Sequence, residues 1–234
     1  MKPINLFCFP FAGGTKYSYN ALLPYVPSFI KFVPIELPGR GTRLGEPLLS
    51  DIHLIADDVY SQVKSKLIRP YAFYGHSMGT LIGYLLTKRI IQDGFDHPIH
   101  LFFTGCAGPS EIESQPKSYH LPKNQFISKL KKMGGSPPEV LDDEEFMDMY
   151  EPILRADFQA AETFCYVKSD PFHIPIWVAI GKDEDATMQQ AESWRKETTA
   201  NVEVFEFPGD HFFILEHQQR LLNMISNGLE KVAV

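Results

Sequence analysis

The chain has 234 residues, a length that suits one α/β domain with an insertion. Hydrophobic residues make up 44% and charged residues 22%, which is the balance of a globular protein with a sizeable core. The formal net charge of -7 argues against a nucleic acid as the main partner, because phosphate backbones require a basic surface. We therefore expect a single folded domain over residues 1–234.

The predicted elements alternate along the chain. A buried strand over 4–9 ends in a Pro-Phe-Ala-Gly-Gly turn, and a second strand over 29–37 stops at Pro-Gly-Arg-Gly. A helix over 53–67, a strand over 71–75 and a helix over 78–94 follow. The remaining elements are strands over 99–108 and 174–181, a helix over 191–199, a strand over 202–209 and a helix over 217–232. Strands that alternate with helices predict an α/β fold, with a mostly parallel central sheet and helices on both faces.

Residues 110–168 interrupt this alternation. The segment contains several helical pieces and no clear strand. We interpret it as a helical lid insertion over one end of the sheet, and not as an independent domain.

The cysteines and the N-terminus indicate a cytoplasmic location. Cys8, Cys106 and Cys165 have no CxxC or Cys/His ligand spacing, which favours reduced thiols over disulfides or a metal site. The apolar N-terminal patch is interrupted by prolines and glycines and lacks a signal-peptide cleavage site. No run approaches the roughly 18 apolar residues of a membrane span.

Residues Gly75 to Gly79 read Gly-His-Ser-Met-Gly and match the G-x-S-x-G pattern between a predicted strand and a predicted helix. Such a turn presents the Ser77 hydroxyl above the edge of the sheet. It also places the Met78 amide at a helix N-terminus, where it can donate to an oxyanion. A chance match is the alternative, but the strand–turn–helix setting favours a nucleophile. We expect His76 to support packing, since adjacent residues in a sharp turn point apart.

A serine hydroxyl needs a general base and an orienting carboxylate to become a nucleophile. In hydrolases with this motif the order along the chain is serine, acid, histidine. His211 follows the last predicted strand and precedes the C-terminal helix. His217 is the nearest rival among the eight histidines, but it lies on that helix, so His211 is the predicted base.

The acid is expected after the strand over 174–181, where three consecutive carboxylates occur: Asp183, Glu184 and Asp185. Three like charges cannot all face one site without raising one another's pKa. One of them is therefore expected to face the histidine, while the others belong to a solvated acidic loop.

The loop after the first strand is the expected source of a second oxyanion donor. The amide of Phe11 or Ala12 is the candidate, and Gly13 and Gly14 would let the backbone approach the substrate. An ordinary Gly-Gly turn is the alternative, but the serine motif elsewhere in the chain favours the functional interpretation.

Several motifs occur together and in order: "FCFPFAGG", "ELPGRGTR", "YGHSMGTLIGYLL", "HLPKNQFISKLKKMGGSPPEVL" and "PGDHFF". With them essentially the whole chain resembles the type II thioesterases of polyketide and nonribosomal peptide synthesis. The animal medium-chain fatty-acid thioesterases are close relatives of that family. The combination is more specific than G-x-S-x-G alone, which is common to all α/β-hydrolases.

The resemblance implies an α/β-hydrolase that cleaves acyl thioesters from the phosphopantetheine arm of acyl or peptidyl carrier proteins. It would remove stalled or aberrant acyl groups, or release product, without a metal or organic cofactor. By resemblance the nucleophile is Ser77, the base is His211, and the oxyanion donors are the amides of Met78 and of Phe11 or Ala12. The implied partners are carrier domains of a synthase. We expect a monomer with no nucleic-acid or membrane partner.

Two positions depart from the family pattern. The family usually has aspartate three residues after the glycine that ends the strand, and here that position is Glu184. Either Glu184 is the acid, or a one-residue loop shift brings in Asp185. The two are therefore predicted together, ahead of Asp183. Asp210 stands where the family more often has glycine, and it either raises the pKa of His211 or faces solvent.

The insertion is expected to set substrate scope. Eight apolar residues could line an acyl channel, although packing against the body is the more common role of such residues: Phe126, Ile127, Leu130, Met133, Phe146, Met149, Ile153 and Phe158. Because carrier proteins tend to be acidic, a basic docking face is also expected. Its candidates, which a solvated helix face explains equally well, are Lys117, Lys123, Lys129, Lys131 and Lys132.

Other functions use the same features. A medium-chain acyl-carrier thioesterase of fatty-acid synthesis would need the same residues, and a carboxylesterase would apply the same triad to oxygen esters. A third alternative is a binding protein that kept the fold and lost catalysis. The presence of both Ser77 and His211 counts against it.

Overall fold

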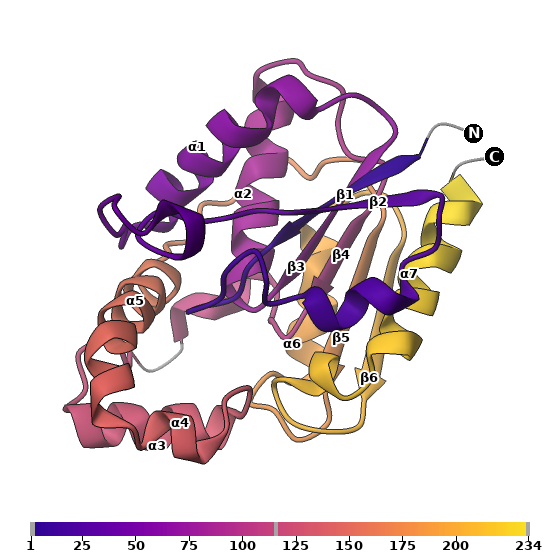
Figure 1. Ribbon diagram of the computed structural model, residues 1–234. Helices are drawn as coiled ribbons and strands as arrows, with labels where there is room; N and C mark the ends of the chain where they lie inside the picture. Colours follow the sequence, from indigo (N-terminus) through magenta and orange to yellow (C-terminus); the bar gives the residue numbers. More distant parts are fainter. Residues whose placement is uncertain (1–2, 115–116, 233–234) are drawn as a thin grey trace.

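The computed structural model describes residues 3–114 and 117–232. Its centre is a six-stranded sheet in the order β2-β1-β3-β4-β5-β6, and every neighbouring pair is parallel (Figure 1). The strands are β1 (Ile4–Phe9), β2 (Ile30–Pro34), β3 (Tyr71–His76), β4 (Leu101–Thr104), β5 (Ile176–Gly181) and β6 (Val202–Phe207). The sheet is thus entirely parallel, whereas the alternation of strands and helices predicts a mostly parallel one.

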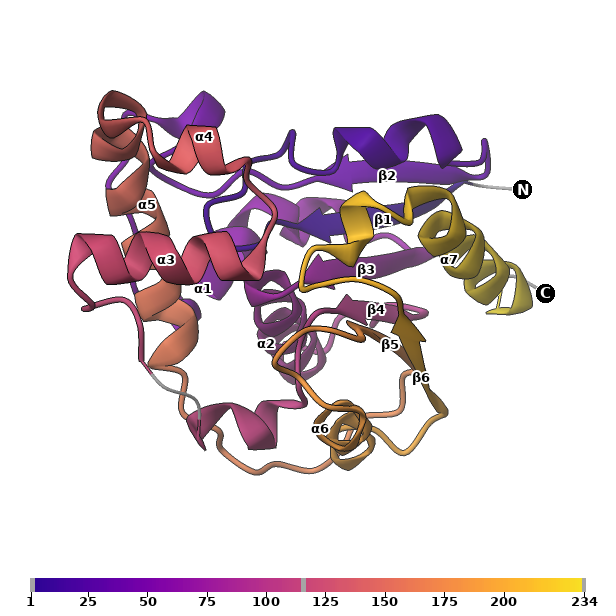
Figure 2. The same cartoon turned by 90° about the horizontal axis from the view of Figure 1, so that it is seen from below.

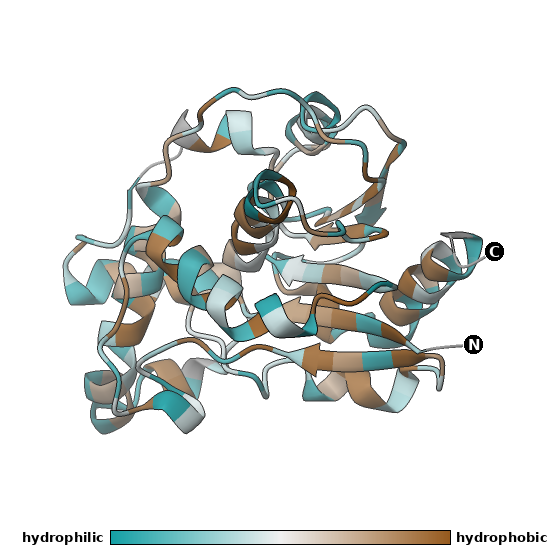
Figure 3. Cartoon of the chain, turned by 90° about the horizontal axis from the view of Figure 1, so that it is seen from above, coloured by the Kyte–Doolittle hydropathy of each residue, from teal (hydrophilic) through white to brown (hydrophobic). Residues whose placement is uncertain are grey.

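The strands are buried on both faces because their apolar residues run nearly without interruption. Side chains alternate between the two faces with period two, so Phe7 packs in one core and Leu6 and Cys8 in the other. Figure 3 shows hydrophobic residues along the strands of the sheet. Such a sheet needs a helical layer on each side.

Helices supply both layers. One core contains residues of α1 (Ile52–Val63), α2 (Met78–Gln92) and α6 (Met188–Glu192). The other contains residues of α7 (Gln218–Val232) and of the 3-10 helix η1 (Asn20–Tyr25), which contact each other (Figure 1). None of the described helices is long and apolar enough to cross a membrane.

Two predicted strands are too long. β2 ends at Pro34, where the predicted strand runs to residue 37, and proline has no amide hydrogen to continue a ladder. β4 ends at Thr104, where the predicted strand runs to residue 108, because Gly105 takes φ 64° and turns the chain out of the sheet.

Helix boundaries differ for local reasons. α1 begins at Ile52, where the Asp51 side chain accepts hydrogen bonds from the first amides, and it ends at Val63 before a 3-10 turn. α6 begins at Met188 behind a capping box of Thr187 and Gln190. Only a 3-10 helix, Ser193–Lys196, covers the middle of the helix predicted over 191–199.

The described residues between β4 and β5 include four helices. These are η4 (Pro109–Ser114), α3 (Lys123–Met133), α4 (Pro138–Leu141) and α5 (Glu144–Glu162). The predicted insertion, 110–168, includes residues 115–116, which lie outside the described residues. Helices α3, α4 and α5 lie to one side of the sheet (Figure 2) and share a small core of their own around Phe126 and Phe158. These three helices are called the lid below.

Candidate active site

β3 and α2 meet in a sharp turn at Ser77. Its backbone has φ 54° and ψ -121°, a conformation that residues with a side chain rarely adopt. A Cβ atom at Gly75 would lie 2.3 Å from the Gly79 carbonyl oxygen, and one at Gly79 would lie 2.4 Å from the Phe9 carbonyl oxygen. Only glycine fits at either position, so the backbone holds Ser77 at the strand–helix junction, where it lines a cavity.

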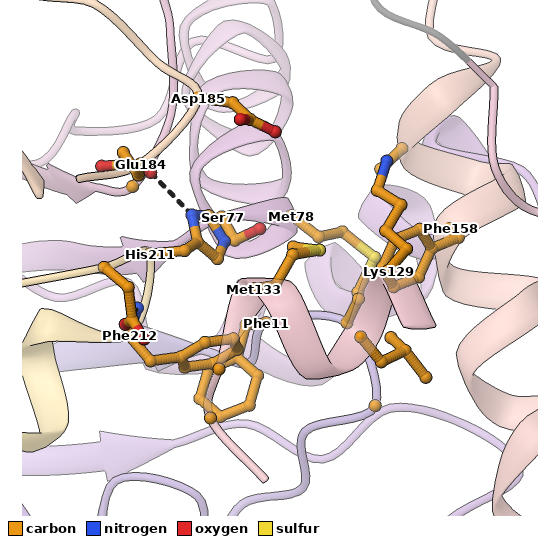
Figure 4. Close-up of a pocket in the computed structure, with 18 of the residues that line it drawn as sticks. Phe11, Ser77, Met78, Lys129, Met133, Phe158, Glu184, Asp185, His211 and Phe212 are labelled. Atoms are coloured by element: carbon orange, nitrogen blue, oxygen red, sulfur yellow. Dashed lines mark hydrogen bonds and ion pairs between the residues drawn. The ribbon is translucent and has the colours of Figure 1, made fainter. Parts of the chain in front are cut away.

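His211 and Glu184 come from the loops after β6 and β5 and bond to each other. Nδ1 of His211 is 2.7 Å from Oε2 of Glu184, whose side chain is 2% exposed (Figure 4). The Gly181 amide donates to the other oxygen, Oε1, at 2.6 Å. Nε2 of His211 is buried and has no hydrogen-bond partner among the described residues. The carboxylate therefore orients the imidazole and leaves Nε2 available to a hydroxyl.

His76 packs against His211. The rings of His76 and His211 are 4.8 Å apart, which brings His211 beside the residue that precedes Ser77. His76 is fully buried, and its Nδ1 is 3.0 Å from the Thr104 hydroxyl. Burial, with His211 as a second cause, holds the pKa of His76 well below its usual value. His76 therefore stays neutral at physiological pH and adds no charge next to His211.

The two other carboxylates of the acidic loop do not reach His211. Asp185 is 76% exposed and lies 3.6 Å from the Lys132 ammonium, apart from the histidine in Figure 4. Asp183 is exposed at the cavity wall. Of the predicted pair Glu184/Asp185, the structure brings only Glu184 to the histidine.

Two nearby polar residues have local partners instead. Asp210 accepts a hydrogen bond from the Phe212 amide at 2.7 Å and lies against Gly134, the residue that follows α3. His217 lies 3.0 Å from the Pro208 carbonyl oxygen through Nε2 and does not line the cavity. Among the described residues, the side chains of Asp210 and His217 make no hydrogen bond to His211 or Glu184.

The predicted oxyanion donors Met78, Phe11 and Ala12 all line the same cavity as Ser77. In the loop after β1, the Gly14 amide bonds to the Phe11 carbonyl at 2.8 Å, and the Gly13 amide bonds to a carboxylate of α5 at 2.7 Å. These two amides are therefore occupied, so Phe11 or Ala12 is the candidate donor from this loop. Met78 begins α2, where backbone amides have no partner within the helix.

A cavity of about 830 Å³ lies between the sheet and the lid and opens beside these residues (Figure 4). Three of the eight candidate lid residues line it: Leu130, Met133 and Phe158. The other five do not: Phe126, Ile127, Phe146, Met149 and Ile153. Phe126 is fully buried in the lid core, whereas Met149 is 69% exposed. Packing and solvation thus account for most of the apolar lid residues, and a minority face the cavity.

The candidate lysines of the lid are mostly paired. Four of them lie near acidic side chains: Lys123 at 2.9 Å from Asp148, Lys129 at 3.7 Å from Glu162, Lys131 at 2.6 Å from Asp142 and Lys132 at 3.6 Å from Asp185. Lys117 is exposed. The lid therefore presents lysines that are locally balanced by carboxylates. Lys132, at 81% side-chain exposure on the cavity wall, is the most accessible of the four.

One part of the site is absent from the sequence predictions. Arg40, from the loop after β2, and Asp157 of α5 form a buried ion pair next to the loop that follows β1. A signal for Asp157 does exist in the sequence. It occupies the apolar face of α5 between Leu154 and Phe158, where a charge requires a buried partner.

These features define an α/β-hydrolase: a parallel sheet, a serine in a strained strand–helix turn, and a histidine–carboxylate pair at the ends of later strands. The family model of the thioesterase domain matches residues 4–229 of the chain. The chain therefore belongs to the thioesterase family, and the protein is a thioester hydrolase.

Individual relatives agree with this assignment. The gramicidin S biosynthesis protein GrsT of Aneurinibacillus migulanus is 36% identical over 231 residues, which cover 98% of this chain and 90% of the relative. The medium-chain S-acyl fatty acid synthase thioesterase of Rattus norvegicus is 28% identical, with 97% and 87% covered. The solved structure of the type II thioesterase BorB from the borrelidin biosynthetic cluster is 28% identical with a TM-score of 0.89, and the match covers 97% of this chain and 93% of that one.

Proposed function

We propose that the protein is a type II thioesterase that hydrolyses acyl groups from the phosphopantetheine arm of carrier proteins in nonribosomal peptide or polyketide synthesis. Its role there is to remove stalled or aberrant groups, or to release product. The observation that carries the chemistry is the bond between His211 and Glu184 beside Ser77, at the wall of an 830 Å³ cavity lined by apolar lid residues. The pathway rests on the relatives named for gramicidin S and borrelidin biosynthesis.

The first chemical step is acyl transfer to Ser77. Nε2 of His211 takes the hydroxyl proton as the serine oxygen attacks the thioester carbonyl carbon. Glu184 holds Nδ1 and stabilises the imidazolium that forms. The amides of Met78 and of Phe11 or Ala12 donate to the carbonyl oxygen as it becomes negative. The tetrahedral intermediate then expels the thiolate of the pantetheine arm, which takes the proton from His211.

The second step is hydrolysis of the acyl-serine ester. Water loses a proton to His211 and attacks the ester carbonyl at the same oxyanion site. Collapse of the intermediate releases the fatty or peptidyl acid, and His211 returns the proton to Ser77. His211 relays the proton in each step and backbone amides stabilise each oxyanion, so the proposal includes no metal and no organic cofactor.

The nucleophile is tested with Ser77→Ala. The purified parent, mixed with acylated carrier protein, is expected to show an increase in mass equal to the acyl group, located at Ser77 by peptide mass spectrometry. The variant is expected to show neither the adduct nor turnover above the rate in buffer. Full activity of the variant contradicts the assignment of Ser77. A panel of acyl groups in the same experiment identifies the preferred chain.

The leaving group is tested by comparing esters. An acyl-pantetheine thioester and the matching oxygen ester present the same acyl chain to the same cavity. We expect kcat/KM for the thioester to exceed that for the oxygen ester. A larger value for the oxygen ester supports a carboxylesterase and contradicts this part of the proposal.

Carrier docking is proposed at the lid face that carries Lys131 and Lys132, because Lys132 is both exposed and at the cavity wall. The variant Lys131→Glu/Lys132→Glu is expected to raise KM for the acyl-carrier protein much more than KM for acyl-pantetheine, since only the former meets the lid surface. Lys123→Glu, at the start of the same helix and away from the cavity, is the control. Equal effects on both substrates contradict docking at this face.

A cytoplasmic location and a monomeric state are further parts of the proposal. The three cysteines are free, as expected for a reducing compartment. Fractionation of the producing cells and light scattering of the purified protein test these two points separately.

A further inference from the structure

Arg40 and Asp157, which are 117 positions apart in the chain, form an ion pair in the interior of the protein. Their side chains are 2% and 0% exposed. Nη2 of Arg40 donates to Oδ1 of Asp157 at 2.7 Å, and Nη1 donates to Oδ2. Two hydrophobic residues could often fill such a space at no cost in stability, because an ion pair loses its hydration on burial. The ion pair therefore indicates a role that apolar side chains could not fill.

The other hydrogen bonds of these residues and of Tyr150 indicate what that role is. Oδ2 of Asp157 also accepts the Gly13 amide at 2.7 Å. The Tyr150 hydroxyl donates to the Gly13 carbonyl oxygen at 3.3 Å, and Nη1 of Arg40 lies 3.4 Å from the Gly14 carbonyl oxygen. Polar groups of α5 and of Arg40 thus bind the backbone of two consecutive residues in the loop after β1.

Steric contacts fix the same point. Gly13 has φ 76°, and a Cβ atom there would lie 2.4 Å from Oη of Tyr150 and 2.6 Å from Cδ2 of Leu154. Tyr150, Leu154 and Asp157 are spaced by four and three residues, so one face of α5 presses on this glycine. The loop is therefore held by both packing and hydrogen bonds from a single helix of the lid.

The residues just before Gly13 are Phe11 and Ala12, which line the same cavity as Ser77 and are the candidate oxyanion donors of this loop. A shift of an oxyanion donor by a fraction of an ångström weakens catalysis, because the donor must meet the oxygen where negative charge develops. We propose that Arg40 and Asp157 are positioning residues, which orient the oxyanion loop by holding Gly13 and Gly14. This proposal rests on the acyl-serine mechanism above and assigns part of the oxyanion site to the lid.

The consequence is that the lid does more than cover the substrate. α5 supplies Phe158 to the cavity wall and, one residue earlier in the helix, Asp157 to the oxyanion loop. Neither Arg40 nor Asp157 lines the cavity. Loss of the pair should therefore change the rate of the chemical step and leave the binding of the acyl chain nearly intact.

The test replaces both partners at once. Arg40→Met/Asp157→Leu removes the charges together and leaves no unpaired buried ion, so the variant is expected to fold. With an acyl-pantetheine thioester, kcat should fall by about tenfold to a hundredfold. This fall is at most as large as the one that follows removal of an oxyanion donor itself. KM should change by less than about threefold, because neither residue lines the cavity. A purely structural role would instead change KM and kcat together.

Two inhibitors separate positioning from binding. A thioether analogue of the substrate has no carbonyl at the reacting position and measures acyl binding alone. A trifluoromethyl ketone analogue forms a tetrahedral adduct with the serine and uses the oxyanion site. In the variant we expect unchanged affinity for the thioether and a loss of affinity for the ketone that parallels the loss in kcat/KM. Equal loss for both inhibitors, or an unchanged kcat in the folded variant, overturns the proposal.

Arg43→Met/Asp58→Leu is the matched control. Arg43 and Asp58 form a two-bond ion pair of similar geometry, at 2.7 and 2.8 Å, on the partly exposed side of the same loop. Its kcat and ketone affinity should equal those of the parent.

If the Arg40/Asp157 variant does not fold, Asp157→Asn is used instead. This variant keeps the size of the side chain and supplies one acceptor oxygen in place of two. The same inhibitor comparison then decides, with parallel loss of kcat and ketone affinity expected.

Failure of this proposal is distinct from failure of the proposed function. If Ser77→Ala keeps full activity, the acyl-serine mechanism is wrong. If Ser77→Ala is inactive while the Arg40/Asp157 variants retain the parent's kcat, only the positioning role is wrong.

Discussion

At the scale of single residues, the geometry of Glu184 explains how a glutamate can occupy a position where aspartate is usual. β5 ends at Gly181, and the side chain of Glu184 folds back so that one oxygen accepts the Gly181 amide and the other meets Nδ1 of His211. The extra methylene spans the distance back to the strand end. Both oxygens are engaged, and the carboxylate is held in one orientation.

Replacing this carboxylate should be costly, and replacing its neighbour should not. Glu184→Gln puts either an amide oxygen or an amide nitrogen next to Nδ1, and it removes the charge that stabilises the imidazolium. We expect kcat to fall by on the order of 10³-fold. Asp185→Asn, one residue away and 76% exposed, is expected to stay within about twofold of the parent. Steady-state kinetics with one thioester checks both values, and similar losses in the two variants contradict the assignment.

At the scale of elements, α5 carries two phenylalanines with different surroundings. Phe158 is 8% exposed, lines the cavity and packs its ring 5.2 Å from that of Phe126. Phe146, three turns earlier, is 37% exposed and does not line the cavity. The helix thus has one phenylalanine in position to limit the acyl chain and one that serves as a control.

Phe158→Ala should change chain-length preference. The substitution opens space in the cavity, so longer acyl thioesters gain contacts relative to shorter ones. We expect the ratio of kcat/KM between chains to shift towards the longer one by about fourfold for each additional methylene that fits. Phe146→Ala should leave the ratio unchanged. Competition assays with mixed acyl-pantetheines measure the ratio, and the same shift in both variants would argue against a cavity effect.

The same helix is anchored by its buried ion pair, which predicts a stability difference. Asp157→Ala leaves the Arg40 guanidinium buried without a carboxylate, and we expect a loss of about 3–5 kcal/mol in the free energy of unfolding. Asp58→Ala breaks the pair with Arg43, whose side chain is 20% exposed, and should cost about 1 kcal/mol or less. Urea unfolding at neutral pH measures both. Equal losses would show that burial of the first pair does not matter.

At the scale of the whole molecule, the helical layers that bury the sheet also bury histidines. The His100 ring stacks on Phe102 at 4.2 Å and meets the edge of Trp177, with 4% of the residue exposed. Burial is the largest cause that lowers the pKa of His100, to about 4 from a usual 6.5. Burial lowers the pKa of His76 in the same direction.

These histidines predict how stability depends on pH. Below pH 6.5 the unfolded chain binds a proton at His100 that the folded protein does not bind until about pH 4. The contribution of His100 is therefore fully present above pH 6.5 and is lost between pH 6.5 and 4, by about 3 kcal/mol.

The comparison with His100→Gln isolates this contribution. The free energy of unfolding should fall less in the variant than in the parent as the pH drops from 6.5 to 4, because glutamine does not titrate. Denaturant unfolding across this range provides the measurement. Identical pH dependence in the two proteins would show that His100 does not contribute.

Much of the architecture follows from local signals. The order of strands and helices could be predicted because buried parallel strands and amphipathic helices leave clear patterns, although β2 and β4 end earlier where Pro34 and Gly105 interrupt the ladder. The turn at Ser77 was equally predictable, because the turn sterically requires Gly75 and Gly79, and the whole motif lies within five consecutive residues.

Other parts depend on contacts between distant segments. Asp183, Glu184 and Asp185 are chemically alike and adjacent, and only the fold of the turn at Gly181 directs one of them to His211. Which lid residues face the cavity was likewise open, because α3 and α5 bury apolar side chains against each other as well as towards the site.

The sequence by itself determined the class of fold, the strand–helix turn at Ser77 and the chain order of the candidate catalytic residues, because each depends on short-range sterics or on periodicity. Only the tertiary structure decided which of the three carboxylates bonds to His211 and which residue pairs with Arg40. The partner of a carboxylate depends on where its oxygens lie in space, and Arg40 and Asp157 are 117 positions apart in the chain, so no local pattern records their contact.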